Sequence, residues 1–441
     1  MRLYKRYSCF LVRHPLYCIY RKKQSFMESR SMTKSFNTAA DCKPQIHYMV
    51  DITERLNQIR CMVDSGKYFT INRGRQYGKT TTLRNLKQFL EPDYLVASLD
   101  FQKIGNARFE NENLFSTAFT RLFLQAIRLQ LDAEPESVKE SVRTLESTAR
   151  SNSYFGLLEL FDCLSSICTK SAKPVVLMID EVDSAANNQV FLDFLAQLRA
   201  YYIDRDITPT FRSVILAGVY DIKNLKRKIR PEEEHKRNSP WNIAADFDID
   251  MSFSAPDIEK MLAEYEQDHH TGMQGAMIAE LLYDYTSGYP FLVSRLCQIL
   301  DETIAGSPAF PDQASAWTKE GVLEAVKMIL SEKNTLFESL TNKLDVYPKL
   351  RELLYTALFS GERISYNLYN DMIGIASMFG FVKNNQGVMV IANRIFETCL
   401  YNLFLSEDEV NSRIYAAGSM DKNQFVQNGN EPGTTGGQIS L

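Results

Sequence analysis

The stretch YFTINRGRQYGKTTTLRNL (68–86) carries the strongest structural signal in this sequence. It begins with an apolar run typical of a strand, passes through a basic loop that contains glycines, and continues as an amphipathic helix that stops at Pro92. The loop ends in Gly78-Lys79-Thr80. A strand, a glycine-bearing turn and a helix that begins at Gly-Lys-Thr are the parts of a phosphate-binding loop. Its backbone N–H groups and lysine face the anion, and its hydroxyl can ligate Mg²⁺.

One position of this loop departs from the usual pattern. A glycine is expected five residues before Gly78, and Arg73 stands there, with Gly74 one place later. Either the loop turns differently, or Gly74 supplies the backbone freedom that the first glycine of the motif normally gives. The candidate nucleotide-binding residues of the loop are Gly74, Gly78, Lys79, Thr80 and Thr81.

A second motif, PVVLMIDEVD (174–183), has the unbroken apolar run expected of a central parallel strand and ends in Asp180-Glu181. In enzymes with a phosphate-binding loop, a carboxylate at the tip of such a strand holds Mg²⁺. A glutamate that follows it can orient and deprotonate the attacking water. An ordinary strand that ends in solvated acids is the alternative, but the two motifs occur in the order that a nucleotide site requires. We therefore assign Glu181, Asp180 and Lys79 to catalysis, and Thr80 and Asp180 to Mg²⁺.

The composition of the whole chain is that of a globular protein. Its 441 residues suffice for two or three domains, and 45% of them are hydrophobic and 24% charged. A net charge of −4 implies no general affinity for nucleic acid or for membranes. The eight cysteines form no C-x-x-C pair, which indicates reduced thiols in a cytoplasmic protein.

Strands alternate with helices in the first half of the chain, so we expect an α/β fold with a parallel, three-layer core over residues 32–253. The strands are predicted at 68–71, 94–101, 175–179, 213–219 and 247–253. The charged segment KNLKRKIRPEEEHKRNSPWNIA (223–244) precedes the last of them. It is either a solvated surface loop or a segment that presents an arginine to a nucleotide on a neighbouring subunit.

Beyond residue 254 the pattern becomes helical, with Ser254 predicted to cap one helix and Pro290 to start another. We interpret 254–340 as a helical lid. Residues 341–410 read as two helices, a hairpin across Asn384 to Gly387 and a last helix, which suggests a winged-helix module. The basic and aromatic residues 1–31 are interpreted as a disordered leader or an upstream extension, with Met32 as the true start, and 411–441 as a disordered tail.

With these segments the chain resembles the bacterial AAA-ATPase-like proteins, within the STAND and origin-recognition branch of P-loop ATPases. The resemblance spans roughly residues 34 to 425. Relatives share the arginine in place of the first glycine of the loop. The segments that carry the resemblance are NRGRQYGKTTTL (72–83), VVLMIDEVDS (175–184), VILAGVYDIKNLK (214–226), NSPWNIA (238–244), SGYPFLVSRL (287–296) and ANRIFE (392–397).

The resemblance implies an ATPase that uses ATP and Mg²⁺, with the residues of the two motifs in the roles assigned above. Gly288 and Pro290 match the family's G-x-P module, which lies near the adenine, and Arg295 matches a sensor in the lid. A further sensor at the end of the fourth strand would be Tyr220 or Asp221.

Many relatives continue past a DKNQF-like sequence, here 421–425, into a nuclease-like PD-(D/E)XK domain. This sequence has a glycine-rich tail there instead. We therefore expect a truncated member of the family and assign no nuclease activity to it.

The leading functional hypothesis is an ATPase whose lid and winged-helix module report the nucleotide state to an unknown protein partner. The alternatives are a non-hydrolysing scaffold, which Glu181 argues against, a small-molecule kinase, which the acidic pair at the strand tip disfavours, and a DNA-binding regulator. The last helix of the module has only Arg394 as a basic residue and the wing only Lys383, so DNA binding should be weak or absent. Self-association through 223–244 is a further possibility, and no membrane association is expected.

Overall fold

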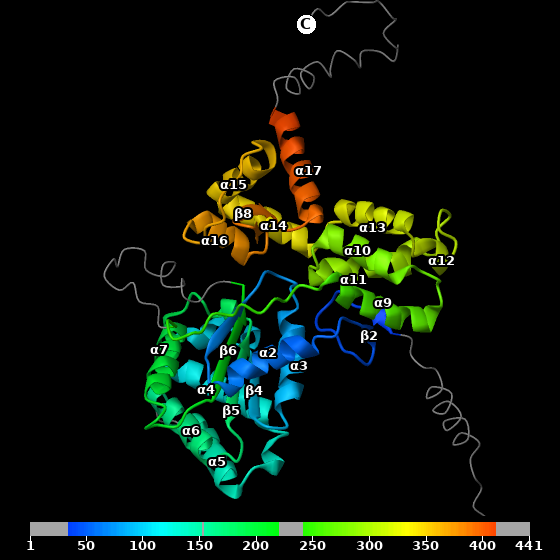
Figure 1. Cartoon of the computed structure of the whole chain (residues 1–441). Helices are drawn as coiled ribbons and strands as arrows, with labels where there is room; N and C mark the ends of the chain where they lie inside the picture. Colours follow the sequence, from blue (N-terminus) through cyan, green and yellow to red (C-terminus); the bar gives the residue numbers. More distant parts are fainter. Residues whose placement is uncertain (1–33, 152–153, 220–240, 412–441) are drawn as a thin grey trace, which may run out of the picture.

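The computed structural model describes residues 34–151, 154–219 and 241–411, with backbone only for 408–411. Figure 1 shows three groups of elements: an α/β unit, a helical lid beside it, and a C-terminal group of helices with a hairpin. The predicted leader and tail, both candidates for the fourth-strand sensor and most of the charged segment 223–244 lie outside the described residues.

Four parallel strands form the sheet of the α/β unit, in the order β3-β6-β5-β4. Asp100 of β4 pairs with Asp180 of β5, and Asn72 of β3 pairs with Gly218 of β6. The carboxyl ends of all four strands therefore meet at one edge of the sheet, where the two sequence motifs come together. The strands are β3 (Phe69–Asn72), β4 (Leu95–Asp100), β5 (Val175–Asp180) and β6 (Ser213–Gly218).

Helices cover both faces of this sheet, as the sequence predicts. Successive side chains of a strand point to opposite faces, so Val176 and Met178 pack with α2 and α3, whereas Leu177 and Ile179 pack with α4 to α7. The helices are α2 (Thr53–Asp64), α3 (Lys79–Leu90), α4 (Glu112–Ile127), α5 (Glu136–Arg150), α6 (Leu157–Lys170) and α7 (Gln189–Ile203), with 3-10 turns η1 (Phe101–Lys103), η2 (Asn106–Phe109), η3 (Leu131–Ala133) and η4 (Val182–Ser184).

The fifth strand predicted at 247–253 is wrong: the structure forms no strand over these described residues, and only a single bridge at Ala245 joins β3. The side chain of Arg73, at the end of β3, explains the difference. Its guanidinium donates to the carbonyls of Phe247 at 3.4 Å and Ile249 at 2.8 Å. These two carbonyls therefore accept from a side chain, and not from the backbone of a neighbouring strand.

The helical lid begins as the sequence predicts. The side chain of Ser254 accepts the N–H of Asp257, and α11 starts at Pro290. The segment 34–50 packs on the lid, because Phe36 and Tyr48 belong to the hydrophobic core of the lid. These elements are β1 (Ser35–Phe36), β2 (His47–Tyr48), α9 (Ala255–His269), α10 (Gly275–Thr286), α11 (Pro290–Ile299), the π-helical η6 (Leu300–Ile304), α12 (Gln313–Ala316) and α13 (Lys319–Ser331).

The C-terminal group shares one continuous hydrophobic core with the lid. The hairpin predicted near Asn384 is confirmed, with Val382 paired to Ile391 across two antiparallel strands. The order of elements agrees with the expectation, but the identification as a winged helix stays a prediction, as does the boundary at 340/341, which falls inside α14. The elements are α14 (Thr335–Val346), α15 (Pro348–Phe359), α16 (Asp371–Met378), β7 (Val382–Asn385), β8 (Val388–Ile391) and α17 (Arg394–Asn411).

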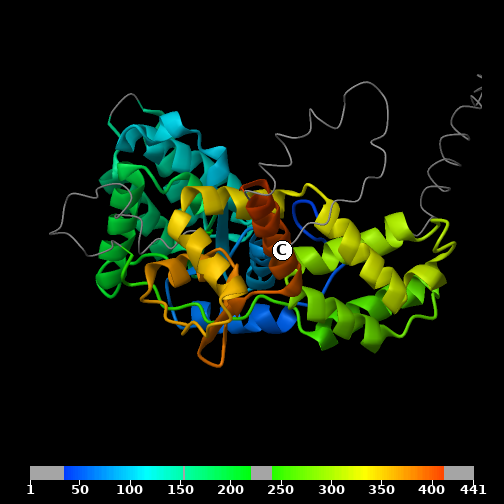
Figure 2. The ribbon, with the colours of Figure 1, turned by 90° about the horizontal axis from the view of Figure 1, so that it is seen from above.

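The three groups meet around one region of the molecule. Seen from above, the C-terminal group, in orange and red, overlies the junction between the α/β unit and the lid (Figure 2). None of the helices within the described ranges has both the length and the apolar character needed to cross a membrane.

Candidate functional site

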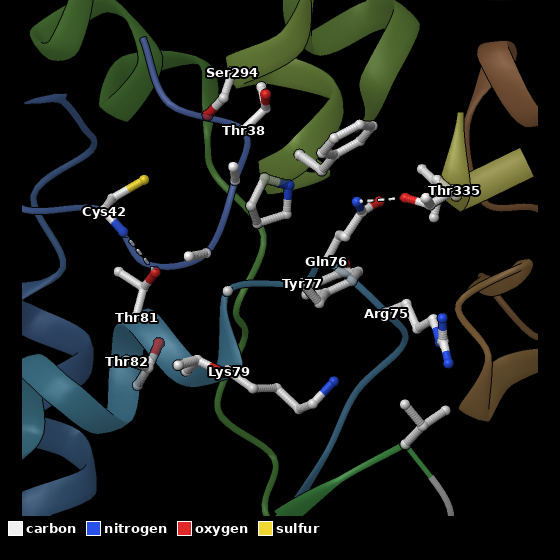
Figure 3. Close-up of a pocket in the computed structure, with 18 of the residues that line it drawn as sticks. Thr38, Cys42, Arg75, Gln76, Tyr77, Lys79, Thr81, Thr82, Ser294 and Thr335 are labelled. Atoms are coloured by element: carbon white, nitrogen blue, oxygen red, sulfur yellow. Dashed lines mark hydrogen bonds between the residues drawn. The ribbon is translucent and has the colours of Figure 1, made fainter. Parts of the chain in front are cut away.

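A cavity of about 690 Å³ opens where the three groups meet (Figure 3). Ligand-binding pockets typically measure about 300–1,000 Å³, so the cavity is large enough for a nucleotide. Its walls come from the segment 37–55, the phosphate-binding loop, the carboxyl edge of the sheet, the lid and the C-terminal group. The predicted site residues that line it are Gly78, Lys79, Thr80, Thr81, Glu181 and Pro290.

The phosphate-binding loop turns at positions other than the one expected. Gln76 and Gly78 have left-handed φ values of 56° and 79°. Gly74 has no such φ, so the suggestion that it supplies backbone freedom is wrong. What Gly74 does permit is close packing, because a Cβ at this position would lie 2.6 Å from the carbonyl oxygen of Phe379 in the C-terminal group.

We expect Gly74→Ala to destabilise the protein, because the added methyl would push Phe379 away from the loop. Overpacking of this kind costs roughly 1–3 kcal/mol of unfolding free energy. Denaturant unfolding measures the loss. The matched control is Gly105→Ala, where a Cβ meets nothing within 4 Å. Equal stability of the two variants would contradict the close contact.

Lys79 is the first residue of α3, and its side chain is only 8% exposed. Its ammonium donates to the carbonyls of Arg73 and Gly74, each at 3.0 Å. Burial lowers the pKa of Lys79, while the neighbouring carboxylates Glu181 and Asp183 oppose this effect. The lysine is therefore held beside the acidic edge of the sheet, with its charge inside the cavity.

Thr80 and Asp180 join the two sequence motifs directly. The Thr80 hydroxyl donates to Oδ2 of Asp180 at 2.7 Å, and Oδ1 of Asp180 accepts the N–H of Glu181 at 2.9 Å. Burial raises the pKa of Asp180, and these two hydrogen bonds act in the opposite direction. The structure thus brings together the two residues that the sequence assigns to Mg²⁺.

Glu181 follows β5 in a left-handed backbone conformation, with φ 55°. This conformation costs a non-glycine residue roughly 1–3 kcal/mol, and such strain concentrates at functional sites. The side chain lines the cavity, whereas the carboxylate of Asp180 stays on Thr80. Burial, and then the negative charge of Asp180, raise the pKa of Glu181.

The segment Gly288-Tyr289-Pro290 connects the lid to the loop. Pro290 lines the cavity, while Gly288, with φ 70°, packs against the backbone of Phe253 so closely that a Cβ would lie 1.9 Å from its oxygen. The Tyr289 hydroxyl donates to the carbonyl of Arg75 in the phosphate-binding loop. Sequence reasoning placed this segment near the site but did not reveal this hydrogen bond.

Arg295, predicted as a lid sensor, lies outside the lining of the cavity. Its guanidinium pairs with both carboxylate oxygens of Glu332, at 3.2 and 2.5 Å, and donates to Gln298 at 2.8 Å. Its sensor role stays a prediction.

The structure adds contacts that the sequence reasoning did not foresee. Asp183 accepts the N–H of Val219 at 2.6 Å and so ties the end of β6 to the acidic turn after β5. The N–H of Cys42 donates to the hydroxyl of Thr81 at 3.2 Å, which lays the segment 37–42 across the start of α3 (Figure 3). The third acid of the DEVD motif was a visible signal for Asp183. No sequence signal marks the segment 37–42 as part of the site. The strands that flank it are only two residues long, too short to give a recognisable pattern.

Comparison with known proteins identifies the family. The model of the family described as AAA-like domain matches residues 47–351, more than half of the chain. A Walker-type ATPase of Pyrococcus abyssi is similar in structure, with a TM-score of 0.54 and 12% identity over 83% of this chain and 99% of that one. At this identity the likeness concerns the fold.

Two further solved structures give lower scores. The ORC2 protein of Aeropyrum pernix, solved as ADPNP-ADP complexes, has a TM-score of 0.40 and 11% identity over 80% of this chain and 93% of its own. Cdc6p of Pyrobaculum aerophilum has a TM-score of 0.37 and 14% identity, with 81% and 94% covered. A comparison with curated proteins finds no match.

Proposed function

Since the chain belongs to the AAA-like domain family, we propose that it binds ATP with Mg²⁺ at the phosphate-binding loop and hydrolyses the terminal phosphate. The observation that carries the proposal is the 2.7 Å hydrogen bond between Thr80 and Asp180, which are 100 residues apart in sequence. This hydrogen bond joins the start of α3, where the phosphates would bind, to the acidic end of β5. We further propose that the lid and the C-terminal group respond to the bound nucleotide, since both line the same cavity.

The oxygens of Thr80 and Asp180 fit a magnesium ion. Mg²⁺ takes oxygen ligands and usually keeps several waters besides one or two carboxylates and the phosphates of its nucleotide. A hydroxyl and a carboxylate oxygen at the end of β5, beside the start of α3, supply this donor set. When bound there, the ion would neutralise part of the phosphate charge.

The remaining chemistry falls to Lys79 and Glu181. The ammonium of Lys79 and the N–H groups at the start of α3 would hold the phosphates. Glu181 would accept a proton from the attacking water, and the raised pKa of this carboxyl makes it a stronger base than an ordinary glutamate. Its place beside Asp180, at the end of the same strand, supports this division of roles.

The pH dependence of hydrolysis should report Glu181. As pH falls through the pKa of Glu181, the carboxylate takes up a proton and can no longer act as a base, so the rate falls. Because the pKa is raised, this acid limb should lie above the usual glutamate value of about 4.3. The pH profile of kcat/KM for phosphate release, which reports the groups of the free enzyme, tests the expectation, with melting checked at each pH. If the pH profile of Glu181→Gln kept the same acid limb, the limb would not come from Glu181 and the expectation would be contradicted.

A nucleotide-dependent scaffold that does not hydrolyse ATP is the second candidate. The bond from Tyr289 to the carbonyl of Arg75 favours it, because binding alone could then change how the lid sits on the loop. Steady-state turnover separates the two functions.

We propose weak or no DNA binding and a cytoplasmic protein with an unknown protein partner. Two contacts support the first point: Lys383 donates to the hydroxyl of Ser287 at 2.8 Å, and Arg394 lies 5.8 Å from the ring centroid of Tyr285. The basic residue of the last helix and that of the wing are thus both engaged within the chain. Self-association through 223–244 stays a prediction, since most of that segment lies outside the described residues.

A further inference from the structure

One face of α14 forms a wall of the nucleotide cavity. Thr335, Leu336, Ser339 and Lys343 all line it. Residues spaced by three or four positions share a face of a helix, so Thr335, Ser339 and Lys343 form one row that ends in a cation. The sequence had divided this helix between the lid and the C-terminal module.

Two contacts fix α14 and its neighbours to the phosphate-binding loop. The side-chain amide of Gln76 donates to the hydroxyl of Thr335 at 3.1 Å (Figure 3). The ammonium of Lys343 lies 4.8 Å from the ring centroid of Phe379, the residue whose carbonyl packs on Gly74. Lys343 therefore contacts the same residue that packs on the phosphate-binding loop at Gly74.

The orientation of Lys79 indicates which end of a nucleotide would meet this wall. In Figure 3 the Lys79 side chain extends from the side of Cys42 and Thr81 toward the side that carries Arg75 and Thr335. A lysine at this position of the motif reaches the terminal phosphates. The end of the phosphate chain would thus point toward the wall formed by α14.

We infer that Lys343 binds the terminal phosphate of ATP and that α14 thereby lets the C-terminal group distinguish ATP from ADP. This inference rests on the proposed function, because it needs a nucleotide in the loop. ADP lacks the phosphate that Lys343 reaches. Arg295 lies outside the cavity lining, whereas Lys343 is part of it.

Isothermal titration with ATP and with ADP, each with Mg²⁺, tests the inference. In Lys343→Met we expect the affinity for ATP to fall about tenfold or more, the usual effect of losing one charge-assisted contact. The affinity for ADP should change by less than about threefold. Lys343→Arg should keep most of the preference for ATP, because it keeps the charge. Lys349→Met, at an exposed lysine of α15, is the matched control.

The outcomes separate the inference from the proposed function. If the wild type binds neither nucleotide, the proposed function is wrong and the inference falls with it. If the wild type binds ATP, but Lys343→Met weakens ATP and ADP equally or neither, only the inference is overturned. Hydrogen exchange of the wild-type α14 amides provides a test that needs no variant. ATP should slow their exchange more than ADP does, and equal protection would overturn the inference.

Discussion

Replacing Glu181 with Gln is expected to leave ATP binding nearly unchanged and to lower hydrolysis by about 10²–10⁴-fold. This loss corresponds to roughly 3–5 kcal/mol in the barrier. The amide keeps the size of the carboxylate but cannot accept a proton from water. Binding should persist because Thr80 still donates to Asp180 and Lys79 remains in the loop. Steady-state phosphate release, measured beside a nucleotide titration, records both quantities.

The matched control for Glu181→Gln is Glu140→Gln, at an exposed position of α5 far from the lining of the cavity. Its rate should equal that of the wild type. If Glu181→Gln itself turns over at the wild-type rate, Glu181 is not the base. Asp183, two residues further on and also in the lining, would be tested next. An absence of turnover in the wild type with every partner tried would favour the scaffold.

Lys79→Ala should abolish measurable ATP binding. The lysine is the buried cation of the loop, and a hydrogen bond to a charged group contributes roughly 1.5–3 kcal/mol. Its loss alone weakens binding by about 10–150-fold. Isothermal titration with ATP and Mg²⁺ is the measurement, with the melting temperature recorded because the ammonium also bonds two loop carbonyls.

The matched control for Lys79→Ala is Lys87→Ala, at the other end of the same helix, where the ammonium lies 3.7 Å from Glu91 near the surface. This variant should bind ATP as the wild type does. Unchanged affinity in a folded Lys79→Ala would show that the loop is not the phosphate site. Loss of binding in both variants would point to damage of α3 and not to a phosphate contact.

Local patterns were enough to predict most of the α/β unit. The strand β5 follows from its unbroken apolar run, and α3 from its periodicity and the stop at Pro92. The strand expected at 247–253 failed for a reason that lies outside the local pattern. The run 247–253 has the pattern of a strand, but its carbonyls bond the side chain of Arg73. An arginine from a distant position in sequence competes for backbone groups, and no local pattern records such competition.

The sequence by itself determined the chemistry of the candidate site. Residue type and order already identify a phosphate loop, with Lys79 and Thr80, and an acidic strand tip, with Asp180 and Glu181. The charge or hydroxyl of each side chain is a property of the residue itself and does not depend on the fold. The tertiary structure decided which further residues join them. Lys343 reaches the cavity because the apolar residues of α14 belong to the hydrophobic core that the lid and the C-terminal group share. Such placement depends on the burial of apolar side chains from distant segments, and that burial is settled only when the whole chain packs.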